Sequence, residues 1–289
     1  MADRHAFANR VAAEWGTPAK VLISAGFAGV LGLLSQFSVP VPWTPVPLTL
    51  QMFGVLLVGT CLGPRFGLLS IAMYLAAGAL GLHVFAPSAD PFNSGGLVSG
   101  ERWRVLVPDL ARHTGFTAGY LIGFLPATLF VGAYLRRRAA GTEAAWARRT
   151  AITLFLLLVG ASAAAFFLAK GNTFAGTGAG PAYSGTMDAL WAFLAAAAVA
   201  VPGVAWWLLR RRGGSEALDL FVVLLAATAI VHLCGVLVLA PTLGLTWTKA
   251  VALGSTVFLP FDALKAGLAV SLTLPFLPSW HGHPPETTA

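Results

Sequence analysis

Long stretches without a charged residue constrain this chain more than any other feature of its sequence. A helix needs about 20 apolar residues to cross the hydrocarbon core of a membrane. Stretches of roughly this kind follow one another at 19–37, 47–62, 65–84, 118–135, 151–169, 188–209, 218–240 and 250–273. The sequence therefore predicts an all-α integral membrane protein, with eight transmembrane helices in a single membrane domain over 1–289.

Composition supports this fold class and excludes a water-soluble domain. Of the 289 residues, 57% are hydrophobic and 10% are charged, whereas a soluble domain carries about 25% charged residues. The net charge is +7. Its basic residues gather in short clusters between the apolar stretches, which indicates loops beside membrane lipid and argues against nucleic-acid binding.

The same basic residues predict how the chain is oriented. Short loops rich in lysine and arginine stay in the cytoplasm. With both ends inside, the inner segments hold twelve basic residues and the outer loops hold five. We therefore expect a multi-pass protein of the plasma membrane with cytoplasmic N- and C-termini. The tail 274–289 is expected to be disordered.

Motifs for catalysis, metals and cofactors are missing from the sequence. No Gly-rich loop ends in Gly-Lys-Ser/Thr, so ATP-driven transport would need another chain to hydrolyse the nucleotide. The two cysteines, Cys61 and Cys234, both lie in apolar sequence and offer neither a disulfide framework nor a zinc site. We expect no catalytic residue, no metal and no cofactor.

Asp262 and Lys265 are the charged residues that lie inside an apolar stretch. Such charges are costly in a membrane and mark functional sites by default. Their spacing of three places them on one helical face. One interpretation is an internal ion pair that only neutralises itself. The other, which we favour, is a ligand site in which Asp262 accepts N–H donors and Lys265 donates to a carbonyl or carboxylate oxygen.

Other polar or helix-breaking residues accompany this pair. Pro260 is expected to free a backbone carbonyl near Asp262. His232 stands alone in its apolar stretch, so we interpret it as a hydrogen-bonded packing residue. Gln51 either lines a site or bonds to a neighbour across a helix interface.

Small residues four apart mark one stripe of the first helix. Ala25 pairs with Gly29, and Ala28 pairs with Gly32. Such stripes let another helix approach closely. The approaching helix can belong to this chain or to a partner protein.

Five ordered blocks of the sequence resemble the BioY family, the biotin-binding S components of energy-coupling factor transporters. The blocks are Val-Pro-Leu-Thr-Leu-Gln at 46–51, Leu-Gly-Pro-Arg-Phe-Gly at 62–67, Tyr-Leu at 74–75 followed by 78–85, Gly-Gly at 95–96 with Thr-Ala-Gly-Tyr at 117–120, and Phe-Leu-Pro-Phe-Asp-Ala-Leu-Lys-Ala at 258–266. The resemblance implies a six-helix S-component core formed by 20–135 and 218–273. Residues 136–217 would then be an inserted transmembrane hairpin. Phe116 and Phe261 depart from the family pattern, which usually has proline and glycine there.

The resemblance also implies a function. Biotin would bind in a pocket open to the outside, with Asp262 and Lys265 bonded to its polar head. The remaining site residues implied by the family motifs are Tyr120, Asn93, Gln51, Thr117 and Gly96. Uptake would require a transmembrane coupling protein and two ATPase subunits, docked through Ala25, Ala28, Gly29 and Gly32 of the first helix.

Two other function classes stay open at this stage. A self-sufficient carrier could couple transport to protons through a titrating Asp262–Lys265 pair. An intramembrane enzyme could use the same pair together with His232, although the sequence lacks a nucleophile motif. The sequence favours the substrate-binding subunit of a transporter over both.

Overall fold

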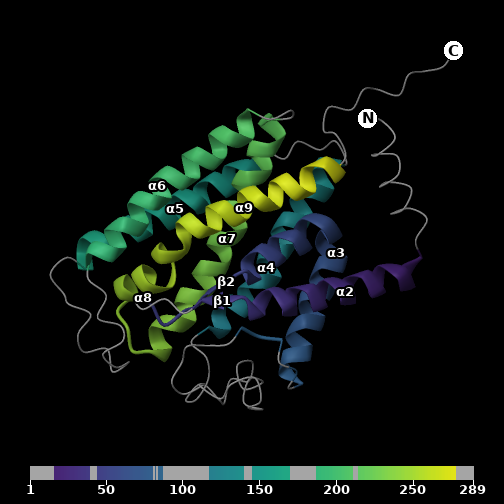
Figure 1. Cartoon of the computed structure of the whole chain (residues 1–289), viewed down its shortest axis with the longest axis horizontal. Helices are drawn as coiled ribbons and strands as arrows, with labels where there is room; N and C mark the ends of the chain where they lie inside the picture. Colours follow the sequence, from purple (N-terminus) through teal and green to yellow (C-terminus); the bar gives the residue numbers. More distant parts are fainter. Residues whose placement is uncertain are drawn as a thin grey trace.

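The chain folds into a bundle of long helices (Figure 1). The computed structural model describes residues 16–39, 44–80, 82, 84–86, 117–139, 145–169, 187–210 and 214–277. Its α-helices are α2 (Thr17–Gln36), α3 (Gln51–Ala79), α4 (Ala118–Ala139), α5 (Ala145–Ala169), α6 (Met187–Leu209), α7 (Gly214–Thr242), α8 (Trp247–Gly254) and α9 (Leu259–Thr273). Two 3₁₀ turns, η5 (Thr256–Phe258) and η6 (Leu274–Phe276), and two short strands, β1 (Ser38–Val39) and β2 (Leu48–Thr49), complete the elements.

The predicted all-α membrane class is confirmed. Within the described ranges, five helical segments are long and apolar enough to cross a membrane: Thr17–Gln36, Gln51–Ala79, Ala118–Ala139, Gly214–Thr242 and Trp247–Phe276. The apolar parts of α5 and α6, Arg149–Ser162 and Ala195–Leu209, are shorter. The count of eight membrane crossings stays a prediction.

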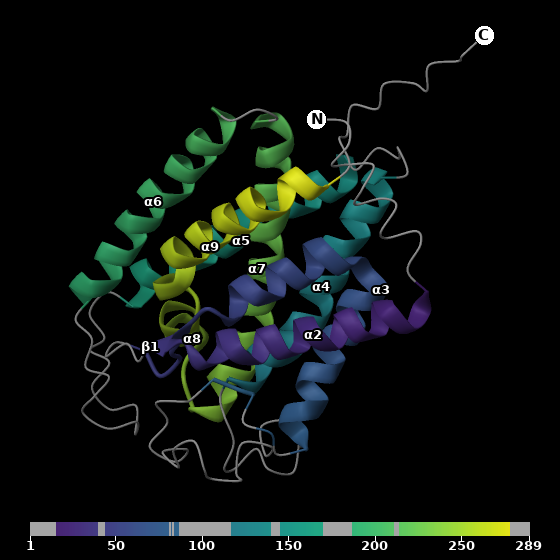
Figure 2. The same ribbon diagram turned by 45° about the vertical axis from the view of Figure 1, so that its right-hand side comes forward.

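A turn at Gly63 divides α3 into two halves, which correspond to the separate apolar stretches predicted at 47–62 and 65–84. Gly63 has φ 68° and ψ −170°, a combination that is almost restricted to glycine, and Pro64 follows it. Gln51 in the first half donates to Tyr74 in the second at 2.5 Å, so the halves lie side by side as a hairpin. Figure 2 shows the change of direction.

The last membrane-spanning segment, Trp247–Phe276, contains the apolar stretch predicted at 250–273, but it is interrupted rather than one continuous helix. The α-helix α8 ends at Gly254, and Ser255 has φ −132° and ψ −57°. The turn η5 then leads into α9. Non-helical backbone at membrane depth is tolerated where it is buried in protein or lines a cavity, and Gly254, Ser255 and Thr256 are all buried.

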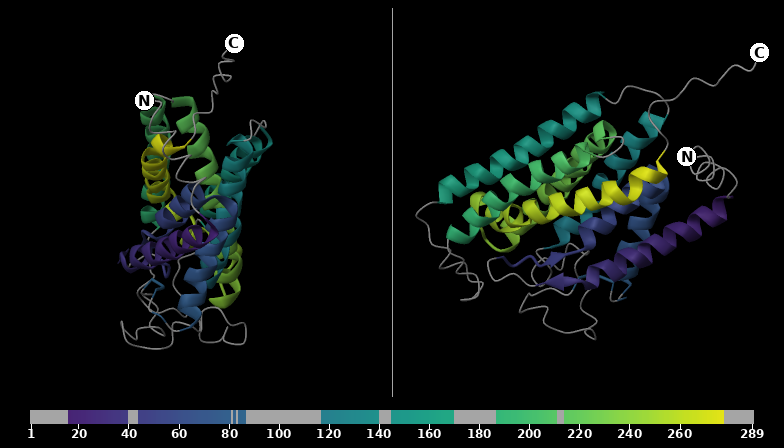
Figure 3. Two further views of the ribbon diagram at one scale, coloured as in Figure 1. Left: turned by 90° about the vertical axis from the view of Figure 1, so that its right-hand side faces the viewer. Right: turned by 45° about the horizontal axis from the view of Figure 1, so that its top comes forward.

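The helices α4 and α7 form the centre of the bundle and pack against each other. The helix α3 covers α4, and α2 packs on α3 at one edge (Figure 3). At the opposite edge, α5 packs on α7 and α8, while α6 packs on α9. The start of α2 and the end of α9 lie toward the same end of the bundle in Figure 1 and in the right-hand view of Figure 3.

The turn at Gly63 yields a test of this fold. Gly63→Ala should lower the free energy of unfolding by about 1–3 kcal/mol, because alanine rarely adopts this backbone conformation. Gly160→Ala is the matched control, since Gly160 lies in α5 and a Cβ there meets no atom within 4 Å. The control should be neutral or stabilising by up to about 1 kcal/mol. Equal thermal unfolding of both variants in detergent would contradict the assigned turn.

Candidate functional site

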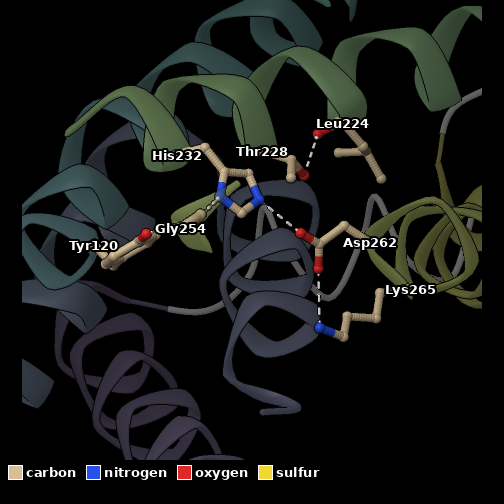
Figure 4. A network of polar contacts seen from close by, with 7 residues as sticks. All are labelled: Tyr120, Leu224, Thr228, His232, Gly254, Asp262 and Lys265. Atoms are coloured by element: carbon tan, nitrogen blue, oxygen red, sulfur yellow. Dashed lines mark hydrogen bonds and ion pairs between the residues drawn. The ribbon is translucent and has the colours of Figure 1, made fainter. Parts of the chain in front are cut away.

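The side chain of Asp262 lies between two cationic or polar partners (Figure 4). Lys265 donates from Nζ to Oδ1 of Asp262 at 2.9 Å. His232 of α7 places Nε2 at 2.8 Å from Oδ2 of Asp262. The exposed fractions of these side chains are 3% for His232, 4% for Asp262 and 11% for Lys265. The cluster is therefore a buried triad rather than the isolated pair that the sequence suggested.

The hydrogen-bond partners of His232 limit where its hydrogens lie. Nδ1 is 3.1 Å from the carbonyl oxygen of Gly254, which can only accept, so Nδ1 carries a hydrogen. Nε2 lies at hydrogen-bond distance from Oδ2 of Asp262, so both ring nitrogens of His232 have polar partners.

The interruption after α8 supplies the carbonyl that His232 needs. The oxygen of Gly254 also accepts a hydrogen bond from the hydroxyl of Tyr120 at 2.6 Å. Inside a continuous helix, this carbonyl would bond to a backbone N–H four residues later. From the sequence we expected Pro260 to free a carbonyl. That expectation is wrong, because Pro260 occupies the first turn of α9, where a proline costs no hydrogen bond.

Tyr120 reaches Gly254 because the helices that surround it approach closely. A Cβ on Gly235 of α7 would lie 2.3 Å from the Tyr120 ring, and a Cβ on Gly254 would lie 2.4 Å from its hydroxyl oxygen. The Tyr120 ring also meets the ring of His232 edge-on, with centroids 6.0 Å apart. These glycines allow α4, α7 and α8 to share one buried hydrogen-bond network.

A pocket opens beside this triad, between α3, α4, α7 and α9. Its empty space amounts to about 820 Å³ including the part open to solvent. The apolar lining residues are Val46, Pro47, Met52, Phe85, Ala86, Leu121, Phe124, Val231 and Phe258. The polar ones are Thr49, Gln51, Thr117, Tyr120, His232, Asp262 and Lys265.

Five of the seven predicted site residues line this pocket: Gln51, Thr117, Tyr120, Asp262 and Lys265. The other two, Asn93 and Gly96, lie outside the described residues. Gln51 both lines the pocket and bonds to Tyr74, so the two interpretations offered for it hold together.

Sequence reasoning left His232 out of the site. The residue is buried and hydrogen-bonded, as expected, but its ring also lines the pocket and contacts Asp262. Its rarity as a titratable residue within an apolar stretch was the available signal. Its partner lies 30 positions away in sequence, so no local spacing reveals the contact. Among the described residues, no group of three or more His, Cys, Asp or Glu side chains could hold a metal ion.

Comparison with known proteins assigns the chain to a family. A model of the BioY family matches residues 9–98 and 151–281, which make up more than half of the chain. The chain belongs to the BioY family. The second matched range begins at residue 151, so it contains Ala195–Leu209 and all but the first two residues of Arg149–Ser162. The match thus includes most of residues 136–217, which we expected to be an insertion relative to the family. The insertion stays a prediction.

Several relatives of the chain are named as biotin transporters. The probable biotin transporter BioY of Pyrococcus horikoshii is 40% identical over 113 residues, which are 39% of this chain and 57% of the relative. The biotin transporter BioY of Thermotoga maritima is 37% identical over 111 residues, or 38% and 54% of the two chains. The chain thus spans little more than half the length of these relatives. The Rhizobium etli biotin transporter BioY is 30% identical over 172 residues, or 58% and 81%.

A solved structure supports the fold. The crystal structure of the S component for biotin from an ECF-type ABC transporter matches with a TM-score of 0.50 and 19% sequence identity. The match covers 88% of each chain. At so low an identity, the structural match shows a shared fold and nothing about function. The chain therefore has an S-component fold and is a multi-pass membrane protein.

The buried triad generates a prediction about stability. Asp262→Ala should lower the free energy of unfolding by about 3–5 kcal/mol, because it leaves the buried cation of Lys265 and a ring nitrogen of His232 without their partner. Asp219→Ala is the control, since Asp219 is 27% exposed in its 3.0 Å ion pair with Arg138. A pair of that kind contributes about 1 kcal/mol or less. Thermal unfolding that is equally impaired in both variants would contradict the role of the triad.

Proposed function

We propose that this chain binds biotin with high affinity as the S component of an ATP-driven vitamin transporter of the energy-coupling factor type. The observation that carries the proposal is the placement of His232, Asp262 and Lys265 at the wall of a largely apolar pocket in a member of the BioY family. Membership in this family favours transport over the alternative of an intramembrane enzyme.

The triad suits the polar head of biotin. A ureido group offers a carbonyl oxygen flanked by N–H groups. The ammonium of Lys265 has three hydrogens and one described bond, to Asp262, so it retains donors for a ligand oxygen. Asp262 retains lone pairs for N–H groups, because each carboxylate oxygen accepts more than one bond.

The apolar walls suit the remainder of the ligand. Met52, Phe124 and Phe258 are among the side chains that would contact the sulfur-containing ring and the aliphatic tail. Small-molecule sites commonly combine such a lining with a few placed polar groups. We place Gln51, Thr117 and Tyr120 in contact with the ligand, and we keep Asn93 and Gly96 as proposed contacts.

We base the proposed docking of partner subunits on the small-residue stripe of α2. Two of its four residues are buried within the chain and two are exposed. Ala28 and Gly32 are buried within the chain, and a Cβ on Gly32 would lie 3.3 Å from Val84. Ala25 and Gly29 are exposed, and a Cβ on Gly29 would meet no described atom within 4 Å. We propose that Ala25 and Gly29 face the coupling protein, which carries the two ATPase subunits.

We further propose that the N- and C-termini are cytoplasmic. The support is that α2 begins and α9 ends toward the same end of the bundle. Arginines predicted to lie inside, including Arg136, Arg137 and Arg138, fall in the last turn of α4. The pocket is lined by residues near the beginning of α3, α4 and α9, and α9 begins toward the other end of the bundle in Figure 1, which would face outside.

A proton-coupled carrier is a second candidate, favoured by one specific observation. His232 and Asp262 contact each other at 2.8 Å inside the bundle, and chains of histidine and carboxylate side chains serve as proton relays in membrane transporters. Such a carrier would transport its ligand without any ATPase. Its dependence on a pH gradient distinguishes it from an S component.

Removal of one cation tests biotin binding. Lys265→Ala should weaken equilibrium binding of biotin to the purified protein in nanodiscs by about ten- to a hundredfold, the effect of losing one hydrogen bond from a charged group. Lys249→Ala is the matched control, because Lys249 lies on α8 away from the pocket-lining residues, and its affinity should be unchanged. No binding by folded wild-type protein, or an equal loss in both variants, would refute the assignment.

A bulky residue on the exposed stripe of α2 tests the energising partner. Gly29→Leu should lower ATP-driven biotin uptake in proteoliposomes at least several-fold, because it blocks close helix approach, and should leave biotin binding intact. Gly160→Leu on α5, also in open space, should leave uptake unchanged. Uptake by the chain alone, driven by a pH gradient, would instead support the proton-coupled carrier.

A further inference from the structure

One wall of the pocket is built from irregular backbone. Phe85 and Ala86 line the pocket, and the described residues Val84 to Ala86 belong to neither a helix nor a strand. The backbone groups of such a segment need partners outside it. The position of this wall therefore depends on whichever element bonds to it.

The last turn of α2 provides these bonds. The hydroxyl of Ser35 donates to the carbonyl oxygen of Val84 at 2.5 Å. The side-chain amide of Gln36 donates to the carbonyl oxygen of Phe85 at 3.2 Å. Each bond joins residues 49 positions apart in sequence. We name Ser35 and Gln36 together the α2 clamp.

Oxygen atoms surround the donors of the α2 clamp. Nε2 of Gln36 reaches Oγ of Ser35 at 2.8 Å, the carbonyl oxygen of Phe85 at 3.2 Å and that of Gly32 at 3.3 Å. Oγ of Ser35 accepts from Gln36 and donates to Val84, with the carbonyl oxygen of Gly32 also in reach at 2.7 Å, and such chains of hydrogen bonds reinforce one another. The oxygens around Nε2 also fix the orientation of the Gln36 amide. A flipped amide would bring its own oxygen, which cannot donate, next to these acceptors.

The backbone held by the α2 clamp orients a buried aromatic ring. Phe85 is 4% exposed, and its ring meets the ring of Tyr74 edge-on at 5.3 Å. A Cβ on Gly78 would lie 2.1 Å from this ring, so the ring fills space that only a glycine leaves open. Tyr74 in turn accepts the hydrogen bond from Gln51, which lines the pocket beside Phe85.

We propose that Ser35 and Gln36 are positioning residues that set the shape of the binding pocket without lining it. They hold Val84 and Phe85, and through the Phe85 ring and Tyr74 they fix the place of Gln51. Loss of the α2 clamp releases this wall and speeds the dissociation of the ligand. The effect on biotin rests on the proposed function, whereas the effect on the wall does not.

Thiol labelling tests the wall without any ligand. A single cysteine, Ala86→Cys, is introduced into a background with Cys61→Ser and Cys234→Ala, and its reaction with a water-soluble thiosulfonate is timed. Ser35→Ala should raise the labelling rate about fivefold, the population ratio expected for the loss of one hydrogen bond. Biotin dissociation in nanodiscs should accelerate by a similar factor.

Ser24→Ala is the matched control for this experiment. Ser24 lies on the same helix and is equally buried, but its hydroxyl bonds within α2 to the carbonyl of Lys20 at 2.9 Å. The control should label at the parental rate. A parental rate in Ser35→Ala, or an equal rise in Ser24→Ala, overturns the proposal.

Gln36→Leu provides a second variant that keeps the proposal testable if Ser35→Ala does not fold. Gln36 is only partly buried at the end of α2, and its loss should also raise the labelling rate. An unchanged rate in a folded Gln36→Leu overturns the proposal as well. If the parent protein binds no biotin, the proposed function fails, while the labelling rates still decide whether the α2 clamp holds the wall.

Discussion

A carboxylate inside a membrane must find partners within the protein, and much of this fold supplies them to Asp262. Lys265 contacts one oxygen from the next turn of α9, and His232 contacts the other from α7. The histidine in turn needs an acceptor for its second nitrogen, which the carbonyl of Gly254 provides. Each partner of a buried polar group is thus itself polar and needs a further partner within the protein.

This chain of requirements explains the irregular backbone at membrane depth. A carbonyl that bonds to side chains has no helical N–H partner, so α8 ends at Gly254 and α9 begins only after η5. Thr44 shows the same principle, because its hydroxyl donates to the carbonyl of Leu253 at 2.6 Å. The segment before β2 is thereby tied to the interrupted helix. Polar groups freed by the interruption hold both the candidate site and one of the segments beside it.

Helix approach determines whether this network can form. Glycines where α4, α7 and α8 meet leave room for Tyr120, so that its hydroxyl and His232 converge on one carbonyl. On the other side of the pocket, α2 contributes through hydrogen bonds of Ser35 and Gln36 to the wall segment. The same helix exposes Ala25 and Gly29. One helix thus combines the proposed partner surface with support for the pocket, on different faces.

Local sequence was sufficient for the membrane class, the turn at Gly63 and the pairing of Asp262 with Lys265, because apolar length, a Gly-Pro step and a spacing of three act over a few residues. It was insufficient for His232, for the interruption at Gly254 and for the burial of Ala28 and Gly32. Those features depend on contacts between residues 22 to more than 50 positions apart. Packing of α2, α4, α7 and α9 brings them together, because a buried polar group is satisfied by whatever lies near it in space.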